Sequence, residues 1–187
     1  HVPSSTQVII DGYHGCGALP TSLREVADRI FYVAGAYKYL QAGEGCCFMS
    51  VPRGTQLRPE YTGWFADFAN LAKPQQATVE YANDGMRFAG ATMDFTALYR
   101  LEAVLQWWHD ANIGVAQIHQ YVQQLQQAFL QVIDALGHPL LRRENLLVDD
   151  LTNHGHFLTF ELATADEVGQ LADKLQRAGI ETDYRGK

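Results

Sequence analysis

Residues 8–17 read Val-Ile-Ile-Asp-Gly-Tyr-His-Gly-Cys-Gly, and this stretch decides the fold. A short β-branched run that passes into a glycine-rich segment is typical of a buried strand followed by a loop. Asp11 is therefore expected at the carboxyl end of a strand. We interpret this strand as the first of an α/β domain.

The residues that follow predict a strand-helix-strand unit. Ser22 and Glu25 have the spacing of a capping box at the start of a helix. The apolar face of that helix comprises Leu23, Val26, Ala27 and Ile30. Residues 31–34, Phe-Tyr-Val-Ala, then read as the next strand. Since a crossover of this length normally joins parallel strands, Asp11 and residues 37–39 should lie at the same edge of the sheet.

The middle of the chain predicts one more strand and a long irregular segment. Only a short loop containing Gly43-Glu44-Gly45 precedes the apolar run at residues 46–51, so this strand should be antiparallel to its neighbour. Residues 52–95 are rich in proline and aromatic side chains. We expect them to form long functional loops around a short helix near residues 64–72.

Two longer helices are predicted next. Helical periodicity runs from Thr96 to Ile113, and Gly114 is well placed to end that helix. The following helix has apolar positions at alternating spacings of three and four: Val115, Ile118, Val122, Leu125, Phe129, Val132 and Leu136. Its length favours a helix packed on a domain over a free-standing coiled coil.

The C-terminal residues predict a small α/β module. We expect a strand from Phe157 to Leu162, a helix from Thr164 to about Ala178 and a strand from Ile180 to Tyr184. The predicted domains are a partial large domain at 1–114, a long connecting helix at 115–137 and a small C-terminal α/β domain at 138–187.

Composition excludes several classes of protein. The chain has 187 residues, with 14 lysine and arginine residues against 21 aspartate and glutamate residues, so a nucleic-acid-binding face is not expected. The most apolar stretch, residues 31–51, contains Lys38 and Glu44 and is not a membrane span. Three cysteines without regular spacing and no N-terminal signal peptide favour a soluble, cytoplasmic protein. Because the chain starts at His1 and stops at Lys187 after a predicted strand, we expect a fragment.

Histidines and cysteines are present, but we predict no metal site. The candidates are His14, Cys16, Cys46, Cys47, His154 and His156. No Cys-x-x-Cys spacing occurs, and the adjacent Cys46 and Cys47 should point to opposite faces of a strand.

Asp11 and Lys38 form the most informative pair, because consecutive parallel strands would deliver them to one crevice. A lysine flanked by Tyr37 and Tyr39 in an apolar setting can lose its charge and become a nucleophile. Carbanion chemistry on pyridoxal phosphate needs such a lysine and a carboxylate for the pyridinium nitrogen. An exposed loop lysine without a function is the alternative from position alone.

The same residues carry a family resemblance. The ordered motifs are Asp11-Gly12-Tyr13-His14, Tyr37-Lys38-Tyr39-Leu40 with Gly43-Glu44-Gly45, Gly63-Trp64 and Arg87-Phe88-Ala89-Gly90-Ala91-Thr92. From about residue 7 to its end, the chain resembles the class V aminotransferase family of pyridoxal-phosphate enzymes. Within that family it is most similar to the kynureninases. The implied fold is part of a fold-type-I large domain, a mostly parallel sheet with helices, plus a truncated small domain.

The resemblance implies a role for each matching residue. Lys38 would form the internal aldimine with pyridoxal 5'-phosphate, and Asp11 would pair with the pyridine nitrogen. His14 would lie near the ring or its phenolic oxygen. Tyr37 would contact the phosphate. Trp64 and Thr92 would do so from the partner subunit of a homodimer with shared active sites.

The resemblance leaves the reaction open. It implies an enzyme that acts on a small amino-acid substrate, as a transaminase or lyase, and a kynureninase-like hydrolase that cleaves a Cβ–Cγ bond is an alternative. Cysteine desulfurases of the family use a cysteine in a late loop, and no cysteine follows Cys47. That chemistry is therefore disfavoured. A truncated, non-catalytic remnant of such an enzyme is the rival hypothesis.

Overall fold

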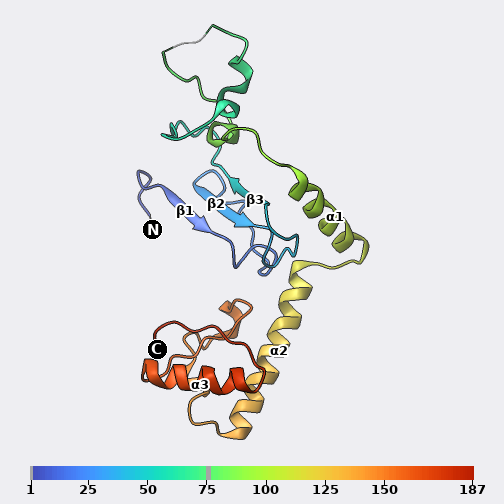
Figure 1. The fold of residues 1–187 in the computed structure, drawn as a ribbon, viewed down its shortest axis with the longest axis vertical. Helices are drawn as coiled ribbons and strands as arrows, with labels where there is room; N and C mark the ends of the chain where they lie inside the picture. The colour runs from blue at the N-terminus through green and yellow to red at the C-terminus, as the bar shows by residue number, and fades with distance from the viewer. Residues whose placement is uncertain (1, 75–76) are drawn as a thin grey trace. The chain divides into compact units, whose positions relative to one another are not determined.

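The computed structural model describes residues 2–74 and 77–187 (Figure 1). The chain divides into two compact units, one that runs to Ala116 and one from Gln117 to Lys187. Helices and strands occur together in the first unit, as predicted for an α/β protein. None of the helices in the described residues combines the length and the apolar character that crossing a membrane requires.

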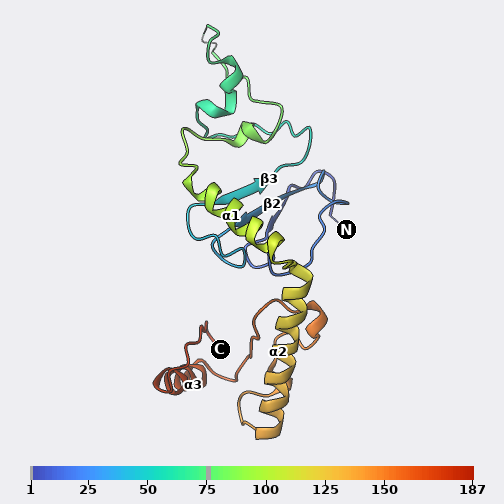
Figure 2. The same ribbon diagram turned by 90° about the vertical axis from the view of Figure 1, so that its right-hand side faces the viewer.

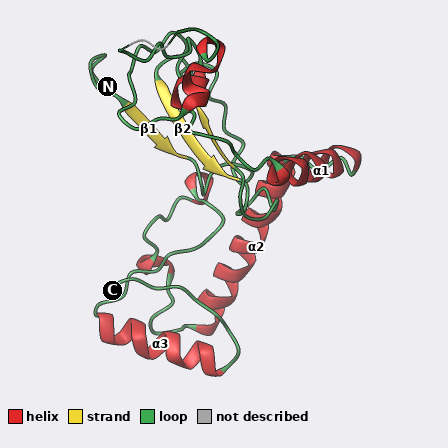
Figure 3. Ribbon diagram, turned by 45° about the horizontal axis from the view of Figure 1, so that its top comes forward, coloured by secondary structure: helices red, strands yellow, loops and turns green. Residues whose placement is uncertain are grey.

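A three-stranded sheet organises the first unit. Its strands are β1 (Val8–Asp11), β2 (Ile30–Gly35) and β3 (Cys47–Ser50), in the order β1-β2-β3. β1 and β2 are parallel (Figure 3), whereas β2 and β3 are antiparallel (Figure 1), which confirms both predicted strand directions. β1 and β2 therefore end at one edge of the sheet, and β3 begins there.

The prediction of a helix between β1 and β2 is wrong. Residues 24–29 form turns, in which Val26 N–H donates to the Leu23 carbonyl at 3.0 Å and Arg29 N–H donates to the Val26 carbonyl at 2.8 Å. Ile30, which we expected on the apolar face of that helix, starts β2 instead and is 6% exposed. Burial in the sheet outweighs the local helical pattern because the strand pairing removes this side chain from water.

β2 is the best-buried strand of the sheet. Phe31 is 6% exposed and Ala34 is fully buried, whereas Ile9 in the edge strand β1 is 69% exposed. The prediction of a buried first strand is therefore wrong for β1. The hydrophobic interior of this unit lies under β2 and the segment that follows it, where Ala36 and Leu40 are also buried.

The described residues between 52 and 95 form an irregular block that contains two short 3-10 helices, η1 (Trp64–Asn70) and η2 (Gly85–Phe88). Figures 1 and 2 both show it beyond the end of β3, on the far side of the sheet from the loops that follow β1 and β2. Phe65 N–H donates to the Gly90 carbonyl at 3.2 Å, which joins the two halves of the block. The predicted short helix near 64–72 is thus confirmed in place and forms with 3-10 geometry.

Two longer helices follow. α1 (Thr96–Asp110) ends three residues before the predicted end, because Asn112 adopts a left-handed conformation with φ of 54°. α2 (Val115–Leu136) begins where predicted and ends one residue before the predicted end at 137. Its predicted apolar stripe is not the buried face: Phe129 is 45% exposed, whereas Gln126 is 6% exposed and Leu130 is fully buried.

In the second unit, loops pack against one face of α2. Gln123 and Gln126 of α2 donate to the carbonyls of Leu151 and Gly155, each at 2.8 Å, which explains why glutamines occupy this face. The unit also contains η3 (Arg143–Asn145), η4 (Leu151–Asn153) and α3 (Ala165–Arg177).

The predicted C-terminal helix is confirmed, but the predictions of a strand before it and a strand after it are wrong. Thr164 and Glu167 form a complete capping box at the start of α3. Around the strand predicted at 157–162 the structure has only an isolated bridge between Leu146 and Phe160, and residues 180–184 form no strand. Alternating apolar residues need a pairing partner to become a strand, and among the described residues they lack one of sufficient length.

Candidate functional site

Asp11 is held in a fixed orientation at the carboxyl end of β1. Its Oδ1 accepts a hydrogen bond from the Tyr13 backbone N–H at 2.9 Å, and Gly12 N–H donates to the Val33 carbonyl of β2 at 2.7 Å. A Cβ atom at Gly12 would lie 2.1 Å from Cζ of Tyr32, so a larger residue here would require the Tyr32 ring to move. The Asp-Gly pair therefore turns the chain tightly and leaves the carboxylate exposed at the edge of the sheet.

Lys38 reaches the same edge from the turn that follows β2. Its Nζ lies 2.8 Å from Nε2 of His14, in the loop that follows Asp11. The rings of Tyr13 and Tyr37 lie together on one side of the same Nζ, with their centroids at 5.9 and 5.8 Å. These are distances at which an aromatic face attracts an ammonium group. The prediction that parallel strands bring the Asp11 and Lys38 segments to one edge is confirmed by the pairing of β1 with β2.

The contact between Lys38 and His14 joins two groups that both exchange protons. A charged Lys38 ammonium can only donate, so His14 must then present a lone pair on Nε2. Conversely, a protonated Nε2 can donate to the neutral amine. Among the described residues Lys38 forms no ion pair with Asp11. The amine and the carboxylate are thus presented separately to a ligand.

Tyr13 is a site residue that our sequence analysis missed. Its hydroxyl donates to Sγ of Cys47 at 3.1 Å, and its ring lies 5.8 Å from the ring of Tyr37. The hydrogen bond to Cys47 is the main cause that raises the pKa of Tyr13 to about 12. The phenol therefore keeps its proton at alkaline pH values at which an ordinary tyrosine has ionised. The sequence did contain a signal for the contact between Tyr13 and Cys47. An antiparallel third strand places Cys47 opposite Gly35, at the same edge of the sheet as the loop that carries Tyr13.

The other cysteines differ from Cys47 in exposure. Cys46 is buried, whereas Cys47 is exposed. Burial raises the pKa of the Cys16 thiol, which keeps it protonated and a poor nucleophile. In the described part of the chain, no group of three or more His, Cys, Asp or Glu residues could hold a metal ion.

Trp64 and Thr92 lie in the 52–95 block and not in the Lys38 cluster. Tyr32 pairs with Ser50, so the chain leaves β3 beside the start of β2, at the edge opposite Lys38. Within the block, Gly63 N–H donates to the Ala89 carbonyl at 3.3 Å, which brings the segments before Trp64 and Thr92 together. Trp64 packs against Phe65 and Phe68, with ring centroids at 4.9 and 5.7 Å.

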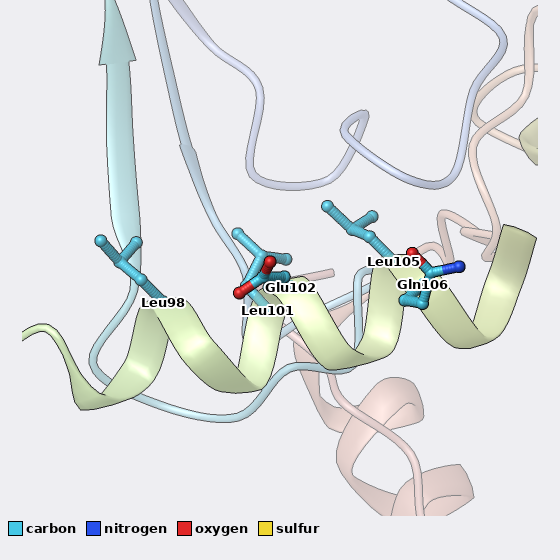
Figure 4. Close-up of a pocket in the computed structure, with 5 residues that line it drawn as sticks. All are labelled: Leu98, Leu101, Glu102, Leu105 and Gln106. Carbon is cyan, nitrogen blue, oxygen red and sulfur yellow. The ribbon is translucent and has the colours of Figure 1, made fainter.

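A shallow hollow of about 400 Å³ runs along one side of α1 (Figure 4). Leu98, Leu101 and Leu105 form its apolar side, with Glu102 and Gln106 beside them. None of these residues belongs to the cluster around Lys38. The hollow contains no amine, thiol or imidazole, so we place the candidate chemistry at the edge of the sheet.

Residues 4–185 match a family model described as aminotransferase class-V. A comparison with curated proteins finds no sequence match. Among solved structures, the apo structure of cysteine desulfurase from Thermococcus onnurineus NA1 is similar, with a TM-score of 0.70 and 14% sequence identity.

The structural match covers 94% of this chain and 41% of the desulfurase chain. This chain therefore spans less than half the length of that protein. At this level of identity the likeness concerns the fold, and the residues of the site have to be argued from their own geometry.

Proposed function

Because the chain belongs to the class-V aminotransferase family, we propose that it binds pyridoxal 5'-phosphate at Lys38 and acts on an amino acid. One observation carries the proposal. Lys38 Nζ lies 2.8 Å from an imidazole nitrogen of His14 and 5.9 and 5.8 Å from the ring centroids of Tyr13 and Tyr37, at the sheet edge where Asp11 ends β1. An amine, an acid and a proton acceptor at one edge are the groups that this cofactor requires.

The residues at this edge fit the reactive part of the cofactor. Lys38 supplies the amine that would hold it covalently, and the exposed carboxylate of Asp11 suits a protonated ring nitrogen. Tyr37 is 39% exposed and offers a hydroxyl that suits a phosphate oxygen. When bound, pyridoxal phosphate supplies an electron sink for charge that develops beside the substrate amine.

Each residue of the chain has a definite task in this proposal. His14 Nε2 takes a proton from Lys38 Nζ and returns it, which their contact of 2.8 Å allows. The Asp11 carboxylate would stabilise the positive charge of the cofactor's ring nitrogen. The Tyr13 N–H group restricts the orientation of this carboxylate. The rings of Tyr13 and Tyr37, which contact each other, shield one side of the amine from water.

We place the second half of the phosphate site on a partner subunit. Trp64 and Thr92 belong to the block that leaves the sheet at the edge opposite Lys38, and both are exposed. Two-fold pairing of two chains could present this block to the neighbour's Lys38 edge. A homodimer with shared sites explains why a chain would gather aromatic and hydroxyl groups so far from its own lysine.

Two reaction types are compatible with these groups. Transamination converts an amino acid into a keto acid, whereas a kynureninase-like hydrolysis cleaves a Cβ–Cγ bond and releases alanine. Both need the same lysine and carboxylate, so the residues at the edge do not separate them. Product analysis by mass spectrometry with kynurenine as the probe substrate distinguishes a keto acid from released alanine.

The experiment that tests the proposal is covalent trapping. The chain is incubated with pyridoxal phosphate, reduced with borohydride and digested, and the modified peptide is identified. We expect the label on Lys38, and Lys38→Arg should abolish it while preserving the charge. Lys73→Arg, which changes an exposed lysine outside the cluster, is the matched control.

A protein that takes up no label, or one labelled equally at all its lysines, would contradict the proposal. Either result would instead favour the hypothesis of a non-catalytic remnant. The trapping should be run twice, once on the chain alone and once on a mixture of the chain with a longer member of the family.

A further inference from the structure

We infer that Tyr13 is a positioning residue that holds the Lys38 amine against His14, and that Cys47 holds Tyr13 in place. The inference rests on the proposed function of Lys38 and adds two residues to that site. Neither acts on a ligand directly. Tyr13 acts through Lys38, and Cys47 acts through Tyr13.

Three side chains surround the end of Lys38. The imidazole of His14 contacts Nζ at 2.8 Å, and the rings of Tyr13 and Tyr37 lie at 5.9 and 5.8 Å from it. The two rings also contact each other, with centroids 5.8 Å apart and planes tilted by 56°. A four-carbon lysine side chain has many rotamers, so two fixed rings beside the amine restrict where it can go.

Gly35 at the end of β2 makes room for this arrangement. A Cβ atom at Gly35 would lie 2.5 Å from Cε1 of Tyr13 and 3.0 Å from Cε1 of Tyr37. Both rings therefore pack over the bare backbone of the strand that leads to Lys38. This close approach ties the rings to the same strand end as the amine that they flank.

The hydroxyl of Tyr13 is anchored on the third strand. It donates to Cys47 Sγ at 3.1 Å, and Cys47 pairs with Gly35 across β2 and β3. The groups that face the phenol are Asp11, Tyr37, Lys38 and Cys47. With its base held by the Asp11 turn and its tip held by Cys47, the ring is fixed at both ends.

The test uses Lys38 reactivity without any cofactor. Competitive labelling with acetic anhydride, read by peptide mapping, compares Lys38 with Lys73 in the same molecule. We expect Tyr13→Leu to raise the ratio of Lys38 to Lys73 labelling about fivefold. This follows because the ring shields the amine and one cation–π contact contributes about 1 kcal/mol. Tyr13→Phe, which keeps the ring, should give a smaller rise.

The hydrogen bond to Cys47 is tested by a double-mutant cycle. Tyr13→Phe and Cys47→Ala each remove the same bond, so the double variant should show no larger labelling ratio than Tyr13→Phe alone. Tyr61→Leu, at a tyrosine that is 91% exposed, is the control and should leave the ratio unchanged.

Two results would overturn the inference. One is an unchanged labelling ratio in Tyr13→Leu, or in Tyr13→Phe if the leucine variant does not fold. The other is additive effects of Tyr13→Phe and Cys47→Ala.

A parallel arm with pyridoxal phosphate separates this inference from the proposed function. In that arm, Tyr13→Leu should lower the share of borohydride-trapped label on Lys38 relative to the other lysines. If the unaltered chain takes up no pyridoxal phosphate but the acetic anhydride ratios respond as described, the proposed function fails and the role of Tyr13 stands.

Discussion

Lys38 Nζ and His14 Nε2 lie 2.8 Å apart although 24 positions separate them in the sequence. They meet because β1 and β2 run in parallel and the chain turns at the same edge after each strand. An imidazole nitrogen at this distance can share a hydrogen bond with the amine and exchange a proton with it. The pair therefore places an amine and a group that can accept a proton at the same edge of the sheet.

His14→Gln should slow the attachment of pyridoxal phosphate to Lys38 about 100-fold, because glutamine fills similar space but cannot take up the proton. The rate is measured by borohydride quenching at successive times and mass spectrometry of the Lys38 peptide. In the control His109→Gln, at an exposed position of α1, pyridoxal phosphate should attach to Lys38 at the same rate as in the unaltered chain. Equal rates for the two variants would remove His14 from the site.

Asp11→Asn should retain attachment at Lys38 and lose the chemistry that follows. Asparagine keeps the Oδ1 acceptor for Tyr13 N–H, so the turn survives while the negative charge is lost. We expect entry of solvent deuterium at Cα of added alanine, followed by NMR, to fall about 1,000-fold, which corresponds to about 4 kcal/mol. Asp11→Glu should lose less, and unaltered exchange in Asp11→Asn would refute the pairing of Asp11 with the ring nitrogen.

The titration of Tyr13 should depend on Cys47. Difference spectra between the unaltered chain and Tyr13→Phe should show phenolate formation near pH 12, and Cys47→Ala should move it toward the ordinary value of 10.0. Because the pKa of Tyr13 is raised in the folded chain, its contribution to stability is present below pH 10 and is lost as the pH rises through about 12. A midpoint unaffected by Cys47→Ala would show that the thiol is not the cause.

Gly63→Ala should destabilise the block that carries Trp64 and Thr92. A Cβ at Gly63 would lie 2.3 Å from the backbone carbon of Gly90, and backbone cannot move aside as a flexible side chain does. We expect a loss of about 1–3 kcal/mol in the free energy of urea unfolding. Gly90→Ala is the matched control because a Cβ there meets nothing within 4 Å.

Mixing two inactive variants tests the shared site. If Trp64 serves the neighbour's Lys38, hybrid dimers of Lys38→Arg and Trp64→Ala contain one site with both residues intact. Trapping of pyridoxal phosphate should therefore recover on mixing, although each variant alone is defective. A mixture that remains as defective as its components, at a concentration where light scattering detects dimers, would place Trp64 outside the site.

The strand directions and the site edge could be predicted from sequence because they depend on local, repetitive signals. Asp11 follows a β-branched run, and the short connection around Gly43-Glu44-Gly45 permits only an antiparallel third strand. The helix before Ile30 could not be predicted correctly, since a local pattern does not show that Ile30 is needed in the sheet. The exposed stripe of α2 through Phe129 was missed for the same reason, because glutamine carboxamides that bind loop carbonyls determine its buried face.

The site itself was predicted unevenly. The positions after strands point to Lys38 and Asp11, and the resemblance adds His14; the structure brings the Lys38 and His14 side chains into contact, and the roles of all three stay predictions. Tyr13 and Cys47 were missed because their contact depends on the register between β2 and β3, which pairs Gly35 with Cys47. The roles of Trp64, Thr92 and Tyr37 toward a phosphate stay predictions.

All three strands of the sheet come from residues 8–50, and each pairs with its neighbour in the chain. Low contact order of this kind favours rapid folding, since only short loops have to close. During synthesis, the edge that carries Lys38 can therefore assemble before α1 and the later residues leave the ribosome. The amine and its imidazole partner would then be in place early, and the remaining chain would fold around an edge that already exists.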